Sequence, residues 1–196
     1  MTDAPGRTHR YLSTTPLYAF GFGMSYTARA YSGLTVSHGA TLSSSDAAAK
    51  VTVHATVTCV DGPSGDEVVQ LYSALRTTAP NAGKRSVPLR ELKAFTRVSL
   101  AGCGRGKGEQ GDAGDAGDAG DAGDAGDAGD APAKTAEVAF ELTAADLALV
   151  DSDGTMRAII GTYDLYLGGT GPPPYGVSVD ASTIPAPLTA TLTVTK

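Results

Sequence analysis

The residues GDEVVQLY, at positions 65–72, decide the fold that we expect for this chain. Most of these side chains suit a pleated strand, and the Gly-Pro-Ser turn just before them marks where the strand begins. Successive side chains of a strand point to opposite faces, so Val69 and Leu71 share one face while Val68 and Tyr72 share the other. We therefore predict a central strand with Val69 and Leu71 in the core and with Val68 and Tyr72 covered from the other side.

An alternation of apolar and polar residues recurs along most of the chain. It appears in residues 34–36, 51–59, 89–100, 138–142, 163–167 and 188–194. Leu89 and Phe95 break the alternation of their stretch, which predicts a β-bulge or a bend there. We expect only a short helical turn, within residues 143–150. With residues 65–72 this makes about seven strands, so the predicted fold class is an all-β, immunoglobulin-like sandwich.

Residues 111–131 repeat Gly-Asp-Ala seven times and contain no apolar side chain larger than alanine. Such a sequence cannot offset an ordering cost of about 1–2 kcal/mol per residue, so we predict a disordered, acidic loop insert over residues 101–134. Calcium capture by its aspartates is the alternative. The seven Asp account for −7 of the net charge of −6, which leaves the remaining chain at +1. A nearly neutral remainder favours neither nucleic acid nor a membrane as a partner.

No stretch of 18 apolar residues occurs, and the first residues lack the basic and apolar regions of a signal peptide. We expect a soluble chain on these grounds, and its compartment is not indicated.

Two cysteines and three histidines are the candidates for disulfide or metal chemistry. Cys59 is in phase with the apolar face of its strand, so we interpret it as a small core side chain. Cys103 lies in a Gly-rich loop and is either a free thiol or the disulfide partner of Cys59. His9, His38 and His54 are far apart and have no Cys or His at ligand spacing, so we expect no metal site.

The charged residues predict no catalytic or cofactor site. Asp66 and Glu67 are adjacent, so their side chains face opposite ways in a strand and do not form an acid–base pair. Asp151 and Asp153 begin like a calcium loop, but the later acidic ligands are missing and a turn is expected. No phosphate-binding or dinucleotide-binding motif is present. A further group is basic and interleaved with Pro and Leu, and we interpret it as a solvated strand face rather than a nucleic-acid surface: Lys84, Arg85, Arg90, Lys93 and Arg97.

Residues 1–30 are irregular in pattern and unusually aromatic. Their rings are Tyr11, Tyr18, Phe20, Phe22 and Tyr26, out of twelve in the whole chain. Exposed rings of this kind either dock against another protein surface or stack on sugar faces. These five are the candidate site residues, for domain docking or sugar stacking.

Four segments in order resemble the C-terminal fibronectin type III-like domain of family 3 glycoside hydrolases. PLYAFGFGMSYT (16–27) is similar to the PLYPFGxGLSYT that leads into that domain, and GDEVVQLY to one of its strands. PLRELKAFTRV (88–98) resembles P-x-K-x-L-K-x-F-x-R-V, and GTYDLYLGG (161–169) resembles the ending P-G-x-Y-x-x-x-V-G-G. PGRTHRY (5–11) resembles the PGRTYRF of the β-xylosidase and arabinofuranosidase branch, which is our preferred parent.

The departures from this pattern are few. Ala19 and Ile160 replace prolines, Cys59 stands where an Asn often ends the second strand, and the Gly-Asp-Ala repeat interrupts a loop. None of them is expected to abolish the sandwich.

The resemblance implies a domain that packs against catalytic domains acting on β-xylosides or β-glucosides of plant-type polysaccharides. Members carry an aspartate nucleophile and an acid/base carboxylate in two preceding domains, and no position here matches either, so we expect a non-catalytic accessory domain. Residues 1–30 would join a catalytic α/β domain, and residues 31–196 would form the sandwich.

Two alternatives remain open at this stage. One is a stand-alone carbohydrate-binding or adhesion module with a polysaccharide partner, and the other is an enzyme active by itself. For a full-length parent the resemblance implies an extracellular or cell-wall location.

Overall fold

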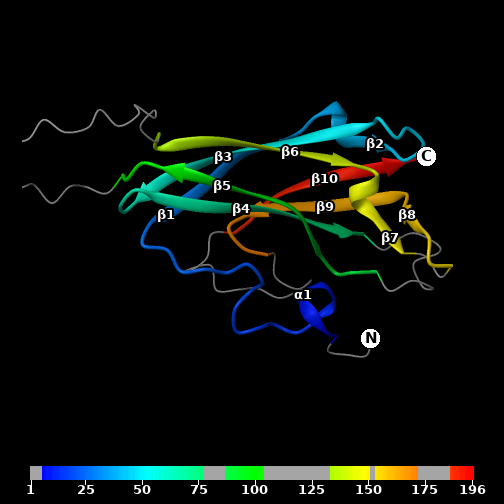
Figure 1. The fold of residues 1–196 in the computed structure, drawn as a ribbon, viewed down its shortest axis with the longest axis horizontal. Coiled ribbons are helices and arrows are strands. Elements are labelled where there is room, and N and C mark those ends of the chain that lie inside the picture. The colour runs from blue at the N-terminus through cyan, green and yellow to red at the C-terminus, as the bar shows by residue number, and fades with distance from the viewer. Residues whose placement is uncertain (1–5, 77–86, 104–132, 151–152, 172–185) are drawn as a thin grey trace, which may run out of the picture.

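The stretches with a period of two form strands because their alternating side chains bury one face of a sheet and expose the other. The structure is a computed structural model that describes residues 6–76, 87–103, 133–150, 153–171 and 186–196. Within these residues the strands form a sandwich of two sheets, and the short helix α1 (Thr8–Tyr11) lies outside it (Figure 1). The predicted all-β fold class is confirmed.

The two sheets are of unequal size. Sheet A has the strand order β1 (Ala28–Val36), β3 (Lys50–Asp61), β6 (Thr135–Thr143). Sheet B has the order β2 (Thr41–Ser43), β10 (Leu188–Thr195), β9 (Gly161–Gly168), β4 (Gly65–Leu75), β5 (Glu91–Leu100). All neighbours are antiparallel except β2 and β10, which are parallel. Strands β7 (Ala148–Val150) and β8 (Met156–Ala158) form a separate pair, and the 3-10 turns are η1 (His38–Ala40) and η3 (Ala145–Leu147).

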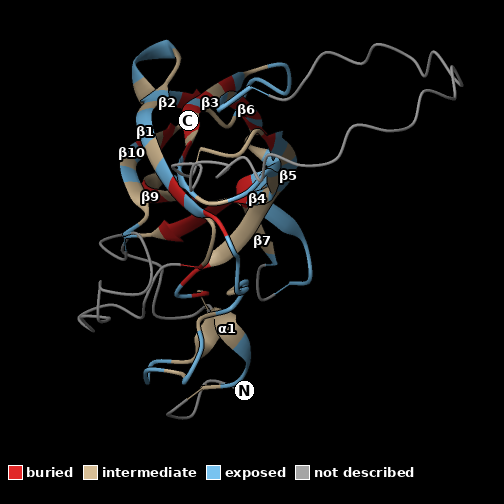
Figure 2. Ribbon diagram, turned by 90° about the vertical axis from the view of Figure 1, so that its left-hand side faces the viewer, coloured by how far each residue is buried: buried red, intermediate tan, exposed pale blue. Residues whose placement is uncertain are grey.

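The apolar faces of the two sheets meet in one core, and the helix α1 contributes no buried residue to it (Figure 2). Members of the core from β3 and β4 are Val51, Val53, Ala55, Val57, Val69 and Leu71, and β9 adds Tyr163, Leu165 and Leu167. Each fully buried aliphatic side chain contributes about 1.5–3 kcal/mol, so this layer is what holds the sheets together.

Strand β4 lies inside sheet B, hydrogen-bonded to β9 on one edge and to β5 on the other, as the sequence predicts. Val69 and Leu71 lie in the core, and Tyr72 is fully buried on the opposite face. The prediction that Val68 is also covered is wrong, because its side chain is 44% exposed. The segment that covers this face reaches Tyr72 but not Val68.

Three strands of three residues each, β2, β7 and β8, were not expected, because so short a strand shows no period. The helical turn expected within residues 143–150 is correct only in its first half, where η3 forms. Asp146 fixes that turn by accepting the Thr143 backbone N–H at 2.8 Å, and the chain then continues as β7. The predicted bulge is confirmed: Leu71 pairs with Ala94 and Tyr72 with Leu92, so Lys93 is the extra residue of β5.

Cys59 and Cys103 form a disulfide, which corrects the interpretation of Cys59 as a plain core side chain and selects the disulfide from the two alternatives left open for Cys103. The bond lies beside the base of the expected insert, where the Ala101 N–H donates to the Ala133 carbonyl and the Cys59 N–H to the Lys134 carbonyl. The Gly-Asp-Ala repeat itself, with the calcium alternative, falls outside the described residues.

The structure also bears on the expected domain boundary and on membrane-spanning helices. The boundary expected between residues 30 and 31 falls inside β1. Among the described ranges, no helix has the length and apolarity needed to cross a membrane.

Replacing Cys59 and Cys103 together by alanine is expected to lower the free energy of unfolding by about 2–4 kcal/mol. The reason is that the bond joins residues 44 positions apart and so restricts the unfolded chain. Equilibrium urea unfolding measures the difference, and the reduced wild-type chain serves as the control because it should match the double variant. A loss below about 0.5 kcal/mol would contradict a stabilising role for this bond.

Candidate functional site

Residues 6–27, which we call the strap, run along the outer face of sheet B, the face opposite to the core (Figure 1). The strap contains α1 and otherwise has no regular structure of its own. Its position therefore depends on contacts with the sheet, and these come from β4, from the start of β5 and from the residues that follow β9.

The carboxamide of Gln70 is the central contact, and the side chain is 5% exposed. Its Nε2 donates to the Gly21 carbonyl at 3.1 Å and to the Gly169 carbonyl at 2.8 Å. Its Oε1 accepts the hydroxyl of Tyr72 at 2.6 Å. Both amide protons and the amide oxygen are thus satisfied by three different parts of the chain, which locks the strap to β4.

Tyr72 and Phe20 add a second contact beside this one. The two rings meet edge to face with centroids 6.5 Å apart, and the Gly171 N–H donates to the Phe20 carbonyl at 2.8 Å. Burial raises the pKa of Tyr72 to about 12, so its hydroxyl stays protonated and available as a donor to Gln70.

Gly21 is required where the strap crosses Gln70. Its φ is +81°, and a Cβ at this position would lie 2.1 Å from Gln70 Oε1. Gly23, two residues further on, has nothing within 4 Å of its ideal Cβ. Gly21 therefore permits the close approach that the Gln70 hydrogen bonds need.

His9 of α1 stacks face to face on Phe20, with ring centroids 3.8 Å apart and an interplanar angle of 11°. Burial lowers the pKa of His9, and the positive charges of Arg90 and Arg10 lower it further, while Glu91 acts in the opposite direction. The neutral imidazole is therefore the form that fits this stack.

A group of charged residues at the start of β5 holds the N-terminal half of the strap. Glu91 pairs with Arg10 and, at 2.8 Å, with Lys93, while the Leu89 N–H donates to the Arg10 carbonyl at 2.7 Å. Arg90 is 5% exposed, and its Nη2 donates to the Leu12 carbonyl at 3.3 Å.

The interpretation of the basic residues as a solvated strand face is therefore wrong for Arg90, which is buried and donates to the strap, and for Lys93, whose side chain is 9% exposed and pairs with Glu91. It is correct for Arg97, whose side chain is mostly exposed and pairs with Asp66. Lys84 and Arg85 lie outside the described residues.

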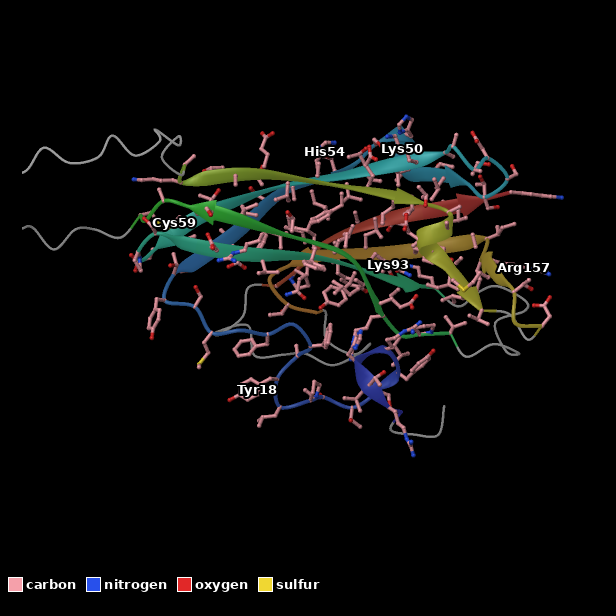
Figure 3. All side chains as sticks on the ribbon, in the orientation of Figure 1. Tyr18, Lys50, His54, Cys59, Lys93 and Arg157 are labelled. Atoms are coloured by element: carbon pink, nitrogen blue, oxygen red, sulfur yellow. A yellow bond between two sulfur atoms is a disulfide. The ribbon has the colours of Figure 1, made fainter. Side chains whose placement is uncertain are left out.

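Three of the five predicted aromatic residues contact another ring, and the other two do not stack on any ring in the described residues. Phe20 belongs to the His9 and Tyr72 stack, and Tyr18 stacks on Phe22 with centroids 5.2 Å apart. Tyr11 is half-buried beneath the Arg10 guanidinium, and Tyr26 is almost fully exposed. Tyr18 points away from the sandwich (Figure 3).

Sequence reasoning missed several exposed apolar residues near these rings. Leu17 and Met24 extend the apolar surface of the strap. Phe95 of β5, which pairs with Gln70, is also exposed, as is Val68 beside it. The signal for Phe95 was present in the sequence, because it stands out of phase with the apolar residues of its strand.

The acidic residues behave as their spacing predicts. Asp66 accepts the Ser99 hydroxyl at 2.5 Å, whereas Glu67 accepts the Tyr31 hydroxyl at 2.5 Å, so the two carboxylates have separate partners. The Ser99 and Arg97 contacts lower the pKa of Asp66. Asp153 forms the expected turn by accepting the Thr155 N–H at 2.9 Å. Within the described part of the chain, no three His, Cys, Asp or Glu side chains gather as metal ligands would.

Comparisons with known proteins point to glycoside hydrolases. No family model matches the chain. A probable β-glucosidase L of Aspergillus terreus is 37% identical over 105 residues, which are 48% of this chain and 14% of that protein. A β-xylosidase of Formosa agariphila is 36% identical over 92 residues, 47% of this chain and 12% of its own length.

A solved structure shares the fold over almost the whole chain. It is a β-glucosidase involved in saponin metabolism from intestinal bacteria, with a TM-score of 0.60 and 25% identity over 97% of this chain and 19% of the other. The chain thus spans about a fifth or less of the length of the relatives it matches. Over about half of its own length it is similar in sequence to β-glucosidases and a β-xylosidase.

Gly21→Ala is expected to loosen the strap, because the added Cβ would displace the Gln70 carboxamide and the positive φ disfavours alanine. A loss of about 1.4 kcal/mol in strap docking raises the open fraction about tenfold. Tryptic cleavage after Arg10, followed by mass spectrometry, measures this fraction. Gly23→Ala is the matched control and should cleave at the wild-type rate. Equal rates for the two variants would contradict the assigned role of Gly21.

Lowering the pH is expected to destabilise the protein through His9. Because its pKa is lower in the folded chain than the ordinary value near 6.5, its contribution is complete above about pH 6.5 and is lost as the pH falls below that value. His9→Phe keeps a ring on Phe20 without a titrating group, so its melting temperature should fall less than the wild type's between pH 7.5 and 5.5.

His54→Gln is the control for this experiment, since His54 is exposed on β3 and should leave the wild-type pH dependence unchanged (Figure 3). If His9→Phe shows the same pH dependence as the wild type, His9 does not couple the strap to pH.

Proposed function

We propose that this chain is a non-catalytic accessory domain of a glycoside hydrolase that acts on β-glucosides or β-xylosides. In this proposal it is a fibronectin type III-like domain of the family 3 type, and its strap docks on the catalytic domains. The observation that carries the proposal is an apolar surface on a strap that polar contacts fix to the sandwich.

The exposed apolar side chains of the strap gather within a short stretch. Leu17, Tyr18, Met24 and Tyr26 are 64–97% exposed. Exposed apolar residues that cluster in this way mark interaction surfaces on soluble proteins. The strap is held by Gln70, Tyr72 and the charged residues of β5, so this surface is ready to bind without reordering, which favours docking.

The comparisons support the class of parent enzyme. The relatives that match over about half of this chain are named β-glucosidases and a β-xylosidase, and each is several times longer than the matched part. The segments PLYAFGFGMSYT, GDEVVQLY and PLRELKAFTRV, which resemble the family 3 accessory domain, support the finer assignment. We prefer the xylosidase branch on the segment PGRTHRY.

The disulfide supports an extracellular or cell-wall location for the parent. Bonds of this kind persist in oxidising compartments and are rare where cellular thiols keep cysteines reduced. Cys59 and Cys103 form such a bond in the described part of the chain.

A carbohydrate-binding module is the second candidate, favoured by Tyr26, which presents both ring faces to solvent. Sugar platforms need several open ring faces on a rigid surface. Phe20 has one face covered by His9, and Tyr18 and Phe22 each cover one face of the other, so Tyr26 alone among these four rings has no stacking partner in the described residues. Docking therefore agrees better with the ring contacts.

The exposed apolar surface is expected to bind a hydrophobic dye and to cause weak self-association of the isolated chain. Replacing Leu17, Met24 and Tyr26 together by serine is expected to reduce the dye binding at least severalfold and to abolish the self-association. The matched control is Val150→Ser with Met156→Ser, because both residues are 61% exposed but lie outside the strap. Dye fluorescence and sedimentation velocity measure the two effects.

Two results would contradict docking through the strap. One is a wild-type chain that binds no more dye than the triple variant does. The other is retardation of the wild-type chain, and not of the triple variant, during electrophoresis in a gel containing xylan or cellulose, which would favour the carbohydrate-binding module.

A further inference from the structure

Arg29 of β1 places a buried positive charge against the disulfide. The residue is 7% exposed, its Nη1 donates to Cys59 Sγ at 3.3 Å, and its Nη2 donates to the Gly65 carbonyl at 3.1 Å. The Nε of Arg29 is buried without a hydrogen-bond partner. The guanidinium is therefore only partly satisfied by the groups around it.

No ion pair between described residues includes Arg29. A buried cation without a counter-charge is costly, and a sulfur atom of a disulfide is only a weak acceptor. A thiolate at the same position would carry a full negative charge against the guanidinium. The surroundings of Cys59 therefore favour the charge that appears when the disulfide opens.

The two sulfur atoms differ in access. Cys59 is buried in β3, whereas Cys103 is partly exposed in the loop after β5. A thiol from solution therefore meets Cys103 first. In thiol–disulfide exchange the sulfur that is not attacked leaves as a thiolate, and it leaves faster when its surroundings stabilise that anion.

We propose that Cys103 is a thiol-exchange site for small thiols of the glutathione class, with Arg29 stabilising Cys59 as the leaving group. The thiolate of the small molecule attacks Cys103 Sγ and forms a new S–S bond there. The Cys59–Cys103 bond breaks, and its electron pair stays on Cys59 Sγ beside the guanidinium. One thiolate is consumed and one is formed, so the step needs no oxidant or reductant. The inference does not depend on the proposed function.

The loop keeps other attachments when this bond opens. The Cys103 N–H donates to the Gly62 carbonyl at 3.0 Å, and the Gly102 N–H donates to the Ser64 hydroxyl at 3.0 Å. These bonds do not involve sulfur. The exchange is therefore a modification of the folded domain and does not require its unfolding.

Exchange of the folded chain with glutathione tests the proposal, with the modified peptide identified by mass spectrometry. The expected adduct is on Cys103. Arg29→Met should slow adduct formation about three- to tenfold, because a leaving-group pKa higher by about one to two units acts with a Brønsted slope of about 0.5. Arg29→Lys keeps the charge and should stay within about twofold of the wild type.

Arg157→Met is the matched control, since this exposed arginine lies at the far end of the sandwich from Cys59 (Figure 3). It should exchange at the wild-type rate. An adduct on Cys59, or an Arg29→Met chain that exchanges as fast as the wild type or faster, would overturn the proposal.

A second measurement separates leaving-group stabilisation from altered access. In a Cys103→Ser chain the ultraviolet absorbance of the Cys59 thiolate is followed against pH, with and without Arg29→Met. The titration midpoint should lie below the ordinary value of about 8.5 when Arg29 is present and should rise by about one unit or more in Arg29→Met. A midpoint at or above 8.5 with Arg29 in place would contradict the role of this arginine.

Discussion

The buried carboxamide of Gln70 is the constraint on which the outer face of sheet B depends. A primary amide has two protons to donate and an oxygen that accepts, and a buried polar group left unpaired costs about 1–3 kcal/mol. Gly21, Gly169 and Tyr72 supply the partners, and they come from the strap, from the end of β9 and from β4 itself. Because three segments meet at one side chain, none of them can shift without leaving a buried group unsatisfied.

The position of the strap follows from this constraint and determines which residues face solvent. Phe20 contacts both His9 and Tyr72, so its ring is engaged in packing within the chain. Leu17 and Met24, which have no such contact in the described structure, remain exposed. The same stack links the strap to a titratable group, His9, whose pKa is lowered by burial. The fold and the proposed docking function are thus connected through a small number of polar contacts.

The sequence predicted features that depend on local period and failed where distant segments meet. The period of two located β3, β4 and β9, and the break at Phe95 predicted the bulge in β5. Burial of Arg90 could not be predicted, because it results from the strap crossing the start of β5. The pairing of Cys59 with Cys103 was left open for the same reason, since a strand and a loop become neighbours only in the sandwich. In the candidate site the rings were identified as a group, but which of them pack and which stay exposed depends on contacts between distant segments, such as that of Phe20 with Tyr72.

The strap is docked on sheet B, and amide hydrogen exchange measures this docking without any substitution. Two backbone amides outside the strap donate to strap carbonyls: that of Gly171 to Phe20 at 2.8 Å and that of Leu89 to Arg10 at 2.7 Å. We expect both amides to exchange at least about 100-fold more slowly than in an unstructured peptide, which corresponds to a docking free energy of about 2.7 kcal/mol. Exchange of both amides at the unstructured rate, while the amides of β3 stay protected, would contradict it.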